Sequence, residues 1–139
     1  MTTTTNEKTM TEYTTYNHLA ASCNLIADEL EAHANGRAYA DENGYVVILD
    51  SEEEPSDEME YRGIYDFINE TIDIEVTCGL SGDYRGAKLY MTVGGPTIWV
   101  DTQNGFVEGR WGTDSYSKWV DSDAIDELNE AIEEIVETR

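Results

Sequence analysis

The spacing of apolar residues changes along this chain, and that change constrains the fold more than any other feature. Residues 16–34 and 123–137 place apolar residues three or four positions apart, which is typical of helices with one buried face. Residues 72–78 instead alternate apolar and polar side chains, as a half-buried strand does. Helical patterns at both ends with strand patterns between them predict an α+β fold, in which helices cover one face of an antiparallel sheet.

Glycine-containing turns separate the predicted elements in the first half of the chain. Asn35-Gly36 is predicted to end the first helix. Asn43-Gly44 predicts a type I′ turn that joins residues 37–42 and 45–50 in a hairpin. The second arm of this hairpin is rich in β-branched residues, so we expect it to be a buried strand.

The predicted order of elements is α-ββ-α-ββββ-α. A short helix over 64–68 precedes a meander, with strands predicted at 72–78, 87–93, 97–101 and 106–111. A chain of 139 residues can bury one sizeable core, so residues 12–139 are predicted to form a single domain. The polar, Thr-rich residues 1–11 are expected to be an unordered tail.

The two long helices are expected to pack on the sheet through one apolar face each. The residues predicted to make this contact are Leu19, Cys23, Ile26, Leu30, Ile125, Leu128 and Ile132. Trp99, Trp111 and Trp119 are expected in the core rather than at an interface, because tryptophan is mostly buried.

The charge balance excludes several classes of function. Asp and Glu number 30 against 8 Lys and Arg, which gives a formal net charge of −22. Such a chain is repelled by nucleic acid and by anionic membranes. No run of about 18 apolar residues could cross a membrane, and residues 1–11 do not resemble a secretory signal. With only two cysteines, we expect a protein of a reducing, cytoplasmic setting.

Signs of catalysis or of cofactor binding are few. The chain contains two histidines, His18 and His33, which we expect on the surface of the first helix. Cys23 and Cys78 follow the apolar faces of their elements and are expected to be small buried hydrophobic residues. We therefore predict no catalytic residue, no cofactor and no dedicated metal site, and hence no enzyme.

Residues 50–60 form an acidic segment with seven carboxylates and no base. Repulsion among these charges and the presence of Pro55 predict a loop. The segment lacks the spacing and the central glycine of a calcium-binding loop. We predict that this segment also binds a partner, as the lesser of two acidic patches. Its predicted binding residues are Glu52, Glu53, Glu54, Asp57 and Glu58.

The last helix carries the first predicted patch. At about 100° per residue, seven acids fall within an arc of about 120° opposite the apolar face. They are Asp123, Asp126, Glu127, Glu130, Glu133, Glu134 and Glu137. Like charges four residues apart destabilise a helix by about 0.2–0.5 kcal/mol per pair, and acids near its C-terminus oppose the helix dipole. An acidic helix face is often only a solvated surface, but this local cost favours recognition.

A row of carboxylates on a helix is, like the phosphate backbone, a regular array of negative charges. A basic groove that binds nucleic acid could accept either. The sequence therefore predicts a protein that occupies the basic nucleic-acid-binding surface of an effector and excludes DNA or RNA, with fast and salt-sensitive association.

Several segments of residues 60–136 resemble small acidic proteins of bacterial phages and conjugative elements. These segments are residues 65–75, 82–86, 94–102 and 111–112. In size, charge and genetic setting the chain is also similar to the DNA-mimicking inhibitors of bacterial defence, the anti-CRISPR and antirestriction proteins. These similarities imply an inhibitor of a CRISPR effector or a restriction enzyme, acting in the cytoplasm of a bacterial host cell. They assign no role to an individual residue.

Two other classes remain open from the sequence. The acidity could serve solvation in a salt-adapted organism, and the scarcity of lysine fits that alternative. An enzyme could also use an unrecognised pair among the many carboxylates, although the chain lacks the usual catalytic motifs.

Overall fold

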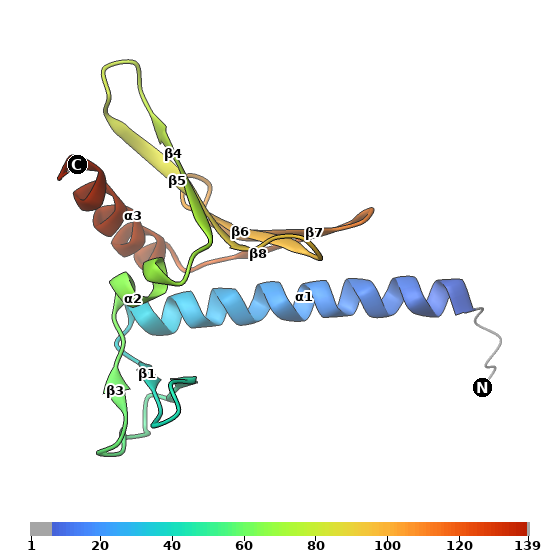
Figure 1. Cartoon of the computed structure of the whole chain (residues 1–139), viewed down its shortest axis with the longest axis horizontal. Helices are drawn as coiled ribbons and strands as arrows, with labels where there is room; N and C mark the ends of the chain where they lie inside the picture. The colour runs from blue at the N-terminus through green and yellow to red at the C-terminus, as the bar shows by residue number, and fades with distance from the viewer. Residues whose placement is uncertain (1–6, 139) are drawn as a thin grey trace.

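The computed structural model describes residues 7–138, with side chains from residue 15 onward (Figure 1). The chain folds into three helices and two antiparallel sheets, so the predicted α+β class is confirmed. The elements are α1 (Glu7–Ala34), β1 (Ala38–Ala40), β2 (Val46–Ile48), β3 (Glu60–Tyr61), α2 (Ile64–Asn69), β4 (Asp73–Cys78), β5 (Tyr84–Thr92), β6 (Thr97–Asp101), β7 (Phe106–Trp111), β8 (Asp114–Trp119) and α3 (Ser122–Glu137). The first helix thus begins within the predicted tail, and residues 1–6 of that tail lie outside the described residues.

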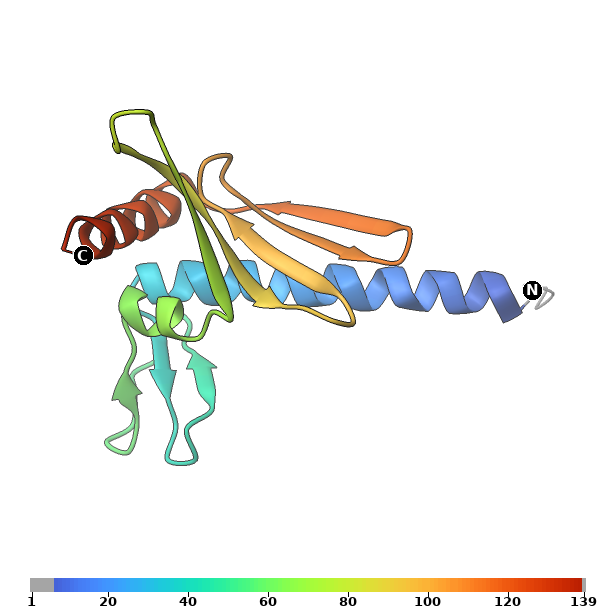
Figure 2. The ribbon, with the colours of Figure 1, turned by 45° about the horizontal axis from the view of Figure 1, so that its top comes forward.

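The larger sheet is a meander of strands in the order β4-β5-β6-β7-β8, and α1 runs along one face of it (Figures 1 and 2). Four of the seven predicted contact residues, Leu19, Cys23, Leu30 and Leu128, are completely buried. Ile125 and Ile132 are also buried, and Ile26 is half-buried against the same core. Burial of these apolar faces is the main stabilising contribution to this layer.

A glycine in β7 allows α1 to lie close to the sheet. A Cβ atom at Gly109 would meet Cys23 Sγ at 2.6 Å and Leu19 Cδ1 at 2.8 Å. Both neighbours are completely buried in a close-packed interior, so an added side chain would compete with them for the same space. Any larger residue at this position would therefore push the helix and the strand apart.

The predicted hairpin forms, but it belongs to a separate small sheet with the order β2-β1-β3. The turn is not of type I′, because Gly44 has a φ of +86° while Asn43 does not have a positive φ. Instead Asp41 accepts backbone hydrogen bonds at its side chain from Asn43 and Tyr45, at 2.9 and 3.0 Å. The second arm is also less buried than predicted, because β2 lies at the edge of the small sheet. Val46–Ile48 are half-buried, and Leu49, just after the strand, is buried.

The large sheet differs from the prediction at both of its edges. Strand β8 was not predicted, because its Ser-rich alternation is weakly apolar; Tyr116 nevertheless packs on α1 and donates a hydrogen bond to Asn24 at 3.0 Å. Strand β4 lies at the opposite edge, and the tip of its hairpin with β5 projects beyond the rest of the sheet (Figure 1). Cys78 is therefore exposed, which corrects the prediction that it is buried.

The last helix packs against α1, α2 and β5 through a compact apolar face. Its buried residues are Ala124, Ile125, Leu128, Ala131 and Ile132. The start of the helix is tied to α1, because the backbone N–H of Asp121 donates to a carboxylate oxygen of Glu31 at 2.9 Å. This packing fixes the opposite face of α3 relative to the rest of the molecule.

Candidate functional site

The predicted acidic face of α3 is present as an exposed surface. All seven carboxylates are exposed, and none forms an ion pair with a lysine or arginine of the described residues. The last turn contains no basic residue that could offset the dipole of the helix. We call this surface, formed by Asp123, Asp126, Glu127, Glu130, Glu133, Glu134 and Glu137, the α3 acidic face.

A shallow groove of about 180 Å³ separates the α3 acidic face from α2. Glu127, Glu130 and Glu134 line one side of it, and Ile64 and Tyr65 line the other. Tyr65 also interacts with Glu134, and desolvation together with that hydrogen bond raises the pKa of the tyrosine above its usual range. The α3 acidic face therefore borders a groove whose opposite wall, on α2, carries an aliphatic and a phenolic side chain.

The second predicted patch lies elsewhere on the molecule. Residues 50–58 are exposed, and the segment connects strands of the small sheet, which extends away from α3 (Figure 2). Backbone N–H groups within the segment are partly satisfied, since Asp50 donates to the side chain of Glu53 at 2.9 Å. The structure does not bring Glu52, Glu53, Glu54, Asp57 and Glu58 together with the α3 acidic face.

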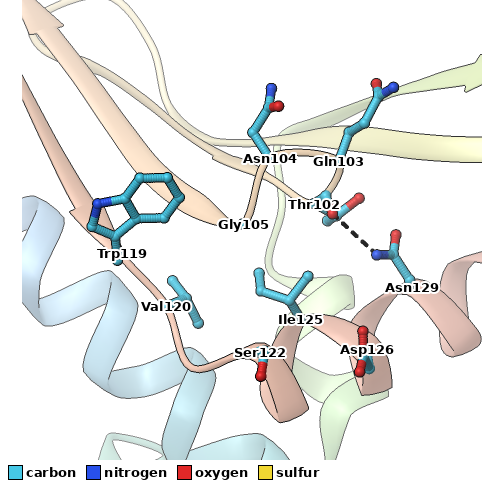
Figure 3. A pocket seen from close by; sticks show the side chains of 10 residues that line it. All are labelled: Thr102, Gln103, Asn104, Gly105, Trp119, Val120, Ser122, Ile125, Asp126 and Asn129. Carbon is cyan, nitrogen blue, oxygen red and sulfur yellow. Dashed lines mark hydrogen bonds between the residues drawn. The ribbon is translucent and has the colours of Figure 1, made fainter.

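A larger pocket, of about 390 Å³, lies beside the N-terminal half of α3 (Figure 3). The turn after β6, the end of β8 and the first turns of α3 form its walls. Its lining residues are Thr102, Gln103, Asn104, Gly105, Trp119, Val120, Ser122, Ile125, Asp126 and Asn129. Asp126 is the single ionisable side chain among them. The sequence did not predict this pocket. Trp119 was expected in the core, but it is 70% exposed and forms part of the pocket wall.

His33 is buried, which corrects its prediction as a surface residue. The ring hydrogen-bonds the carbonyl of Glu29 through Nδ1 at 2.6 Å and accepts from Nε of Arg62 through Nε2 at 3.0 Å. These partners fit a neutral ring protonated at Nδ1. Arg62 in turn forms an ion pair with Glu70 at 2.6 Å. A sequence signal existed, since His33 follows Ile26 by seven residues and so falls on the same helix face.

Burial governs the protonation of this cluster. It lowers the pKa of His33 below its usual range, and the hydrogen bond to the Glu29 carbonyl opposes this shift. The Arg62 guanidinium lowers the pKa further, while the Glu70 and Asp66 carboxylates raise it by smaller amounts. Burial also raises the pKa of Glu29, with a further rise from the Glu70 carboxylate. The cluster joins His33 of α1 to Arg62, just before α2, and Arg62 to Glu70, at the end of α2.

The two cysteines have different surroundings. Cys23 lies between α1 and β7, where burial and the Glu108 carboxylate raise the pKa of its thiol to about 11. A thiol of this kind is a poor nucleophile at neutral pH. Cys78 is exposed at the edge strand β4.

Among the side chains that the structure describes, those of residues 15–138, no group of three or more His, Cys, Asp or Glu has an arrangement that could hold a metal ion. No helix within residues 7–138 is long and apolar enough to span a membrane.

Comparisons with known proteins find no relative. No protein-family model matches the chain, and neither a curated protein nor a solved structure is significantly similar to it. The resemblance of residues 60–136 to small acidic proteins of mobile elements therefore stays a prediction.

Proposed function

We propose that this protein is a non-enzymatic inhibitor of a bacterial defence nuclease, either a CRISPR effector or a restriction enzyme. It binds the basic surface on which that nuclease holds nucleic acid, and it excludes DNA or RNA from it. The observation that carries the proposal is the α3 acidic face: seven exposed carboxylates on one helix, without a base among them.

The charge spacing of this face supports competition with a nucleic acid strand. From Asp123 to Glu137 the helix rises about 21 Å, at about 1.5 Å per residue. Seven carboxylates over that length give about one charge per 3 Å of axis. One strand of duplex DNA carries one phosphate per about 3.4 Å of axis. Lysines and arginines spaced to contact successive phosphates could thus contact carboxylates of α3 at a similar axial spacing.

The packing of α3 against the core holds these charges in fixed positions. Ala124, Leu128 and Ile132 are buried, and Asp121 is hydrogen-bonded to Glu31 of α1. The helix backbone is thereby ordered before any partner arrives, so little conformational entropy is lost on binding. The loop of residues 50–58 lacks such packing, and for this reason α3 is the proposed principal contact.

The test compares two charge-reversed variants of the full chain. Glu127, Glu130, Glu134 and Glu137 are changed together to Lys in one variant, and Glu52, Glu53, Glu54 and Glu58 in the other. Each set raises the formal net charge from −22 to −14, so the variants differ only in the position of the change. Individual exposed ion pairs contribute about 0–1 kcal/mol, and four changes are needed for a clear effect.

The targets are captured with the wild-type chain from bacteria that carry candidate CRISPR and restriction systems. Binding is then measured at low and high salt, together with displacement of DNA or RNA from the captured nuclease. We expect the α3 variant to lose binding and inhibition, and the loop variant to keep most of both. Equal binding by the α3 variant at low salt would mean that this helix is only a solvated face.

A further inference from the structure

The pocket beside the N-terminal half of α3 has the chemistry of a site for one flat cation. Val120 and Ile125, both nearly buried, form its apolar floor (Figure 3). Trp119 stands on one side, while Asp126 and Asn129 of α3 lie on the other (Figure 3). The lining thus combines an aromatic wall, an apolar floor and a single carboxylate.

The walls of the pocket are held in place by internal hydrogen bonds. The nearly buried carboxylate of Asp101 accepts from the backbone N–H groups of Gln103 and Asn104, at 3.1 and 3.0 Å, and fixes the turn after β6. Asn129 donates to the carbonyl of Thr102 at 3.1 Å and accepts from the hydroxyl of Tyr84 at 2.6 Å. The edge-on contact of Trp119 with Phe106, at 5.4 Å between ring centroids, orients the indole. The pocket is therefore formed before a ligand enters.

The charge of the pocket selects the class of ligand. Asp126 is exposed, and no lysine or arginine of the described residues pairs with it. An anion would be repelled by Asp126 and by the acids that follow it on α3. A wholly apolar ligand would leave the carboxylate without a partner for its charge. A cation that stacks on an indole while it binds a carboxylate meets both requirements.

We infer that this pocket binds the guanidinium group of an arginine side chain supplied by the partner. Guanidinium is planar and weakly hydrated, stacks on aromatic faces and donates two parallel hydrogen bonds to a carboxylate. An ammonium group is compact and strongly hydrated, so a lysine fits this lining less well. Since Asp126 belongs to the α3 acidic face, the arginine would come from the same basic surface, and in this respect the inference rests on the proposed function.

The test uses the isolated full chain and two capped tripeptides, Gly-Arg-Gly and Gly-Lys-Gly, titrated by NMR at low salt. The reporters are the indole N–H of Trp119 and the backbone N–H of Gly105, which both line the pocket. The indole N–H groups of Trp99 and Trp111 are the internal reference. We expect saturable shifts at the two reporters with the arginine peptide, and at least 3-fold weaker binding of the lysine peptide.

Two substitutions on the same helix make the result specific. D126N is expected to weaken binding of the arginine peptide about 5- to 10-fold. E133Q removes the same charge from an acid outside the lining and is expected to change binding less than 2-fold. W119F, followed at Gly105, should weaken binding because a phenyl ring is a poorer cation–π partner than an indole. Thermal melting of each variant verifies that it is folded.

Equal effects of D126N and E133Q, or equal binding of the two peptides, would overturn the inference. This outcome is independent of the proposed function, because the peptide experiment contains no nuclease. Conversely, the charge-reversed α3 variant leaves Asp126 and Trp119 unchanged. If that variant binds the target as tightly as the wild type, the result counts against the proposed function alone.

Discussion

At the scale of single residues, Gly109 determines how closely α1 approaches the sheet. Gly109→Ala places a methyl group within 3 Å of Cys23 Sγ and Leu19 Cδ1, and both of these residues are completely buried. We expect a loss of about 1–3 kcal/mol in the free energy of unfolding, as for other overpacked cores. Gly95→Ala is the control, since no atom lies within 4 Å of its added methyl group. Urea denaturation of both variants would show whether the loss is confined to Gly109.

His33 is expected to make stability depend on pH in a predictable direction. Burial holds its pKa below the value near 6.5 of an unfolded chain, so the unfolded chain takes up a proton first as the pH falls. The contribution of neutral His33 to the free energy of unfolding is complete above about pH 6.5. It decreases as the pH falls from there toward the pKa of His33 in the folded chain. Glu29, with its raised pKa, acts in the opposite direction, because protonation relieves its burial.

The measurement compares wild type with His33→Gln, which keeps a donor and an acceptor but does not titrate in this range. Glu29 is present in both chains, so its titration cancels in the comparison. The free energy of unfolding of the wild type should therefore exceed that of His33→Gln by less at pH 5.5 than at pH 7.5. His18→Gln, at an exposed position of the same helix, is the matched control for the substitution itself. A constant difference between wild type and His33→Gln would show that the folded ring titrates normally.

At the scale of elements, α3 combines a well-packed face with a self-repelling one. Pairs such as Glu130–Glu134 and Asp126–Glu130 each destabilise the helix by about 0.2–0.5 kcal/mol. Three carboxylates near its C-terminal end add an unfavourable interaction with the helix dipole. This arrangement costs stability, and no ion pair with a described lysine or arginine offsets that cost, since the contact of Glu134 is with the neutral phenol of Tyr65. This is the reason to look for its use in binding.

The α3 variant with four lysines is therefore expected to fold and to gain stability. Its lysines face the remaining acids of the helix at attractive i,i+3 and i,i+4 spacings, and one lies in the last turn. We expect a gain of about 1–2 kcal/mol at low salt, measured by thermal melting. The loop variant should change little, because residues 50–58 form no helix. A large loss of stability in the α3 variant would mean that its acids have structural partners.

At the scale of the whole molecule, the net charge of −22 acts against the compact state through self-repulsion. Salt screens exposed charges, so the thermal midpoint should rise between about 0.01 M and about 1 M NaCl. The packed core of α1, α3 and the large sheet should nevertheless keep the protein folded in dilute buffer. Cooperative melting at about 0.01 M NaCl is the expected result. Unfolding there would instead favour the alternative of a salt-adapted protein whose acids serve solvation.

The sequence by itself determined the elements that carry strong periodicity. Leu19, Cys23 and Leu128 could be assigned to the core because a helix with one buried face repeats its apolar residues every three or four positions. The same geometry placed the acids of α3 on the solvent side, since unpaired charge cannot follow the apolar face into the core. The candidate acidic face was thus predictable from one segment alone.

The tertiary structure alone decided what depends on residues far apart in the chain. Buried His33 has its partner in Arg62, 29 residues later. Strand β8 pairs with β7, and its Tyr116 reaches Asn24 of α1. The pocket exists because the turn after β6 is bonded to Asn129, 27 residues later. Local patterns report which face of an element is apolar. They do not report which elements meet, because that choice depends on the packing and hydrogen bonding of the whole chain.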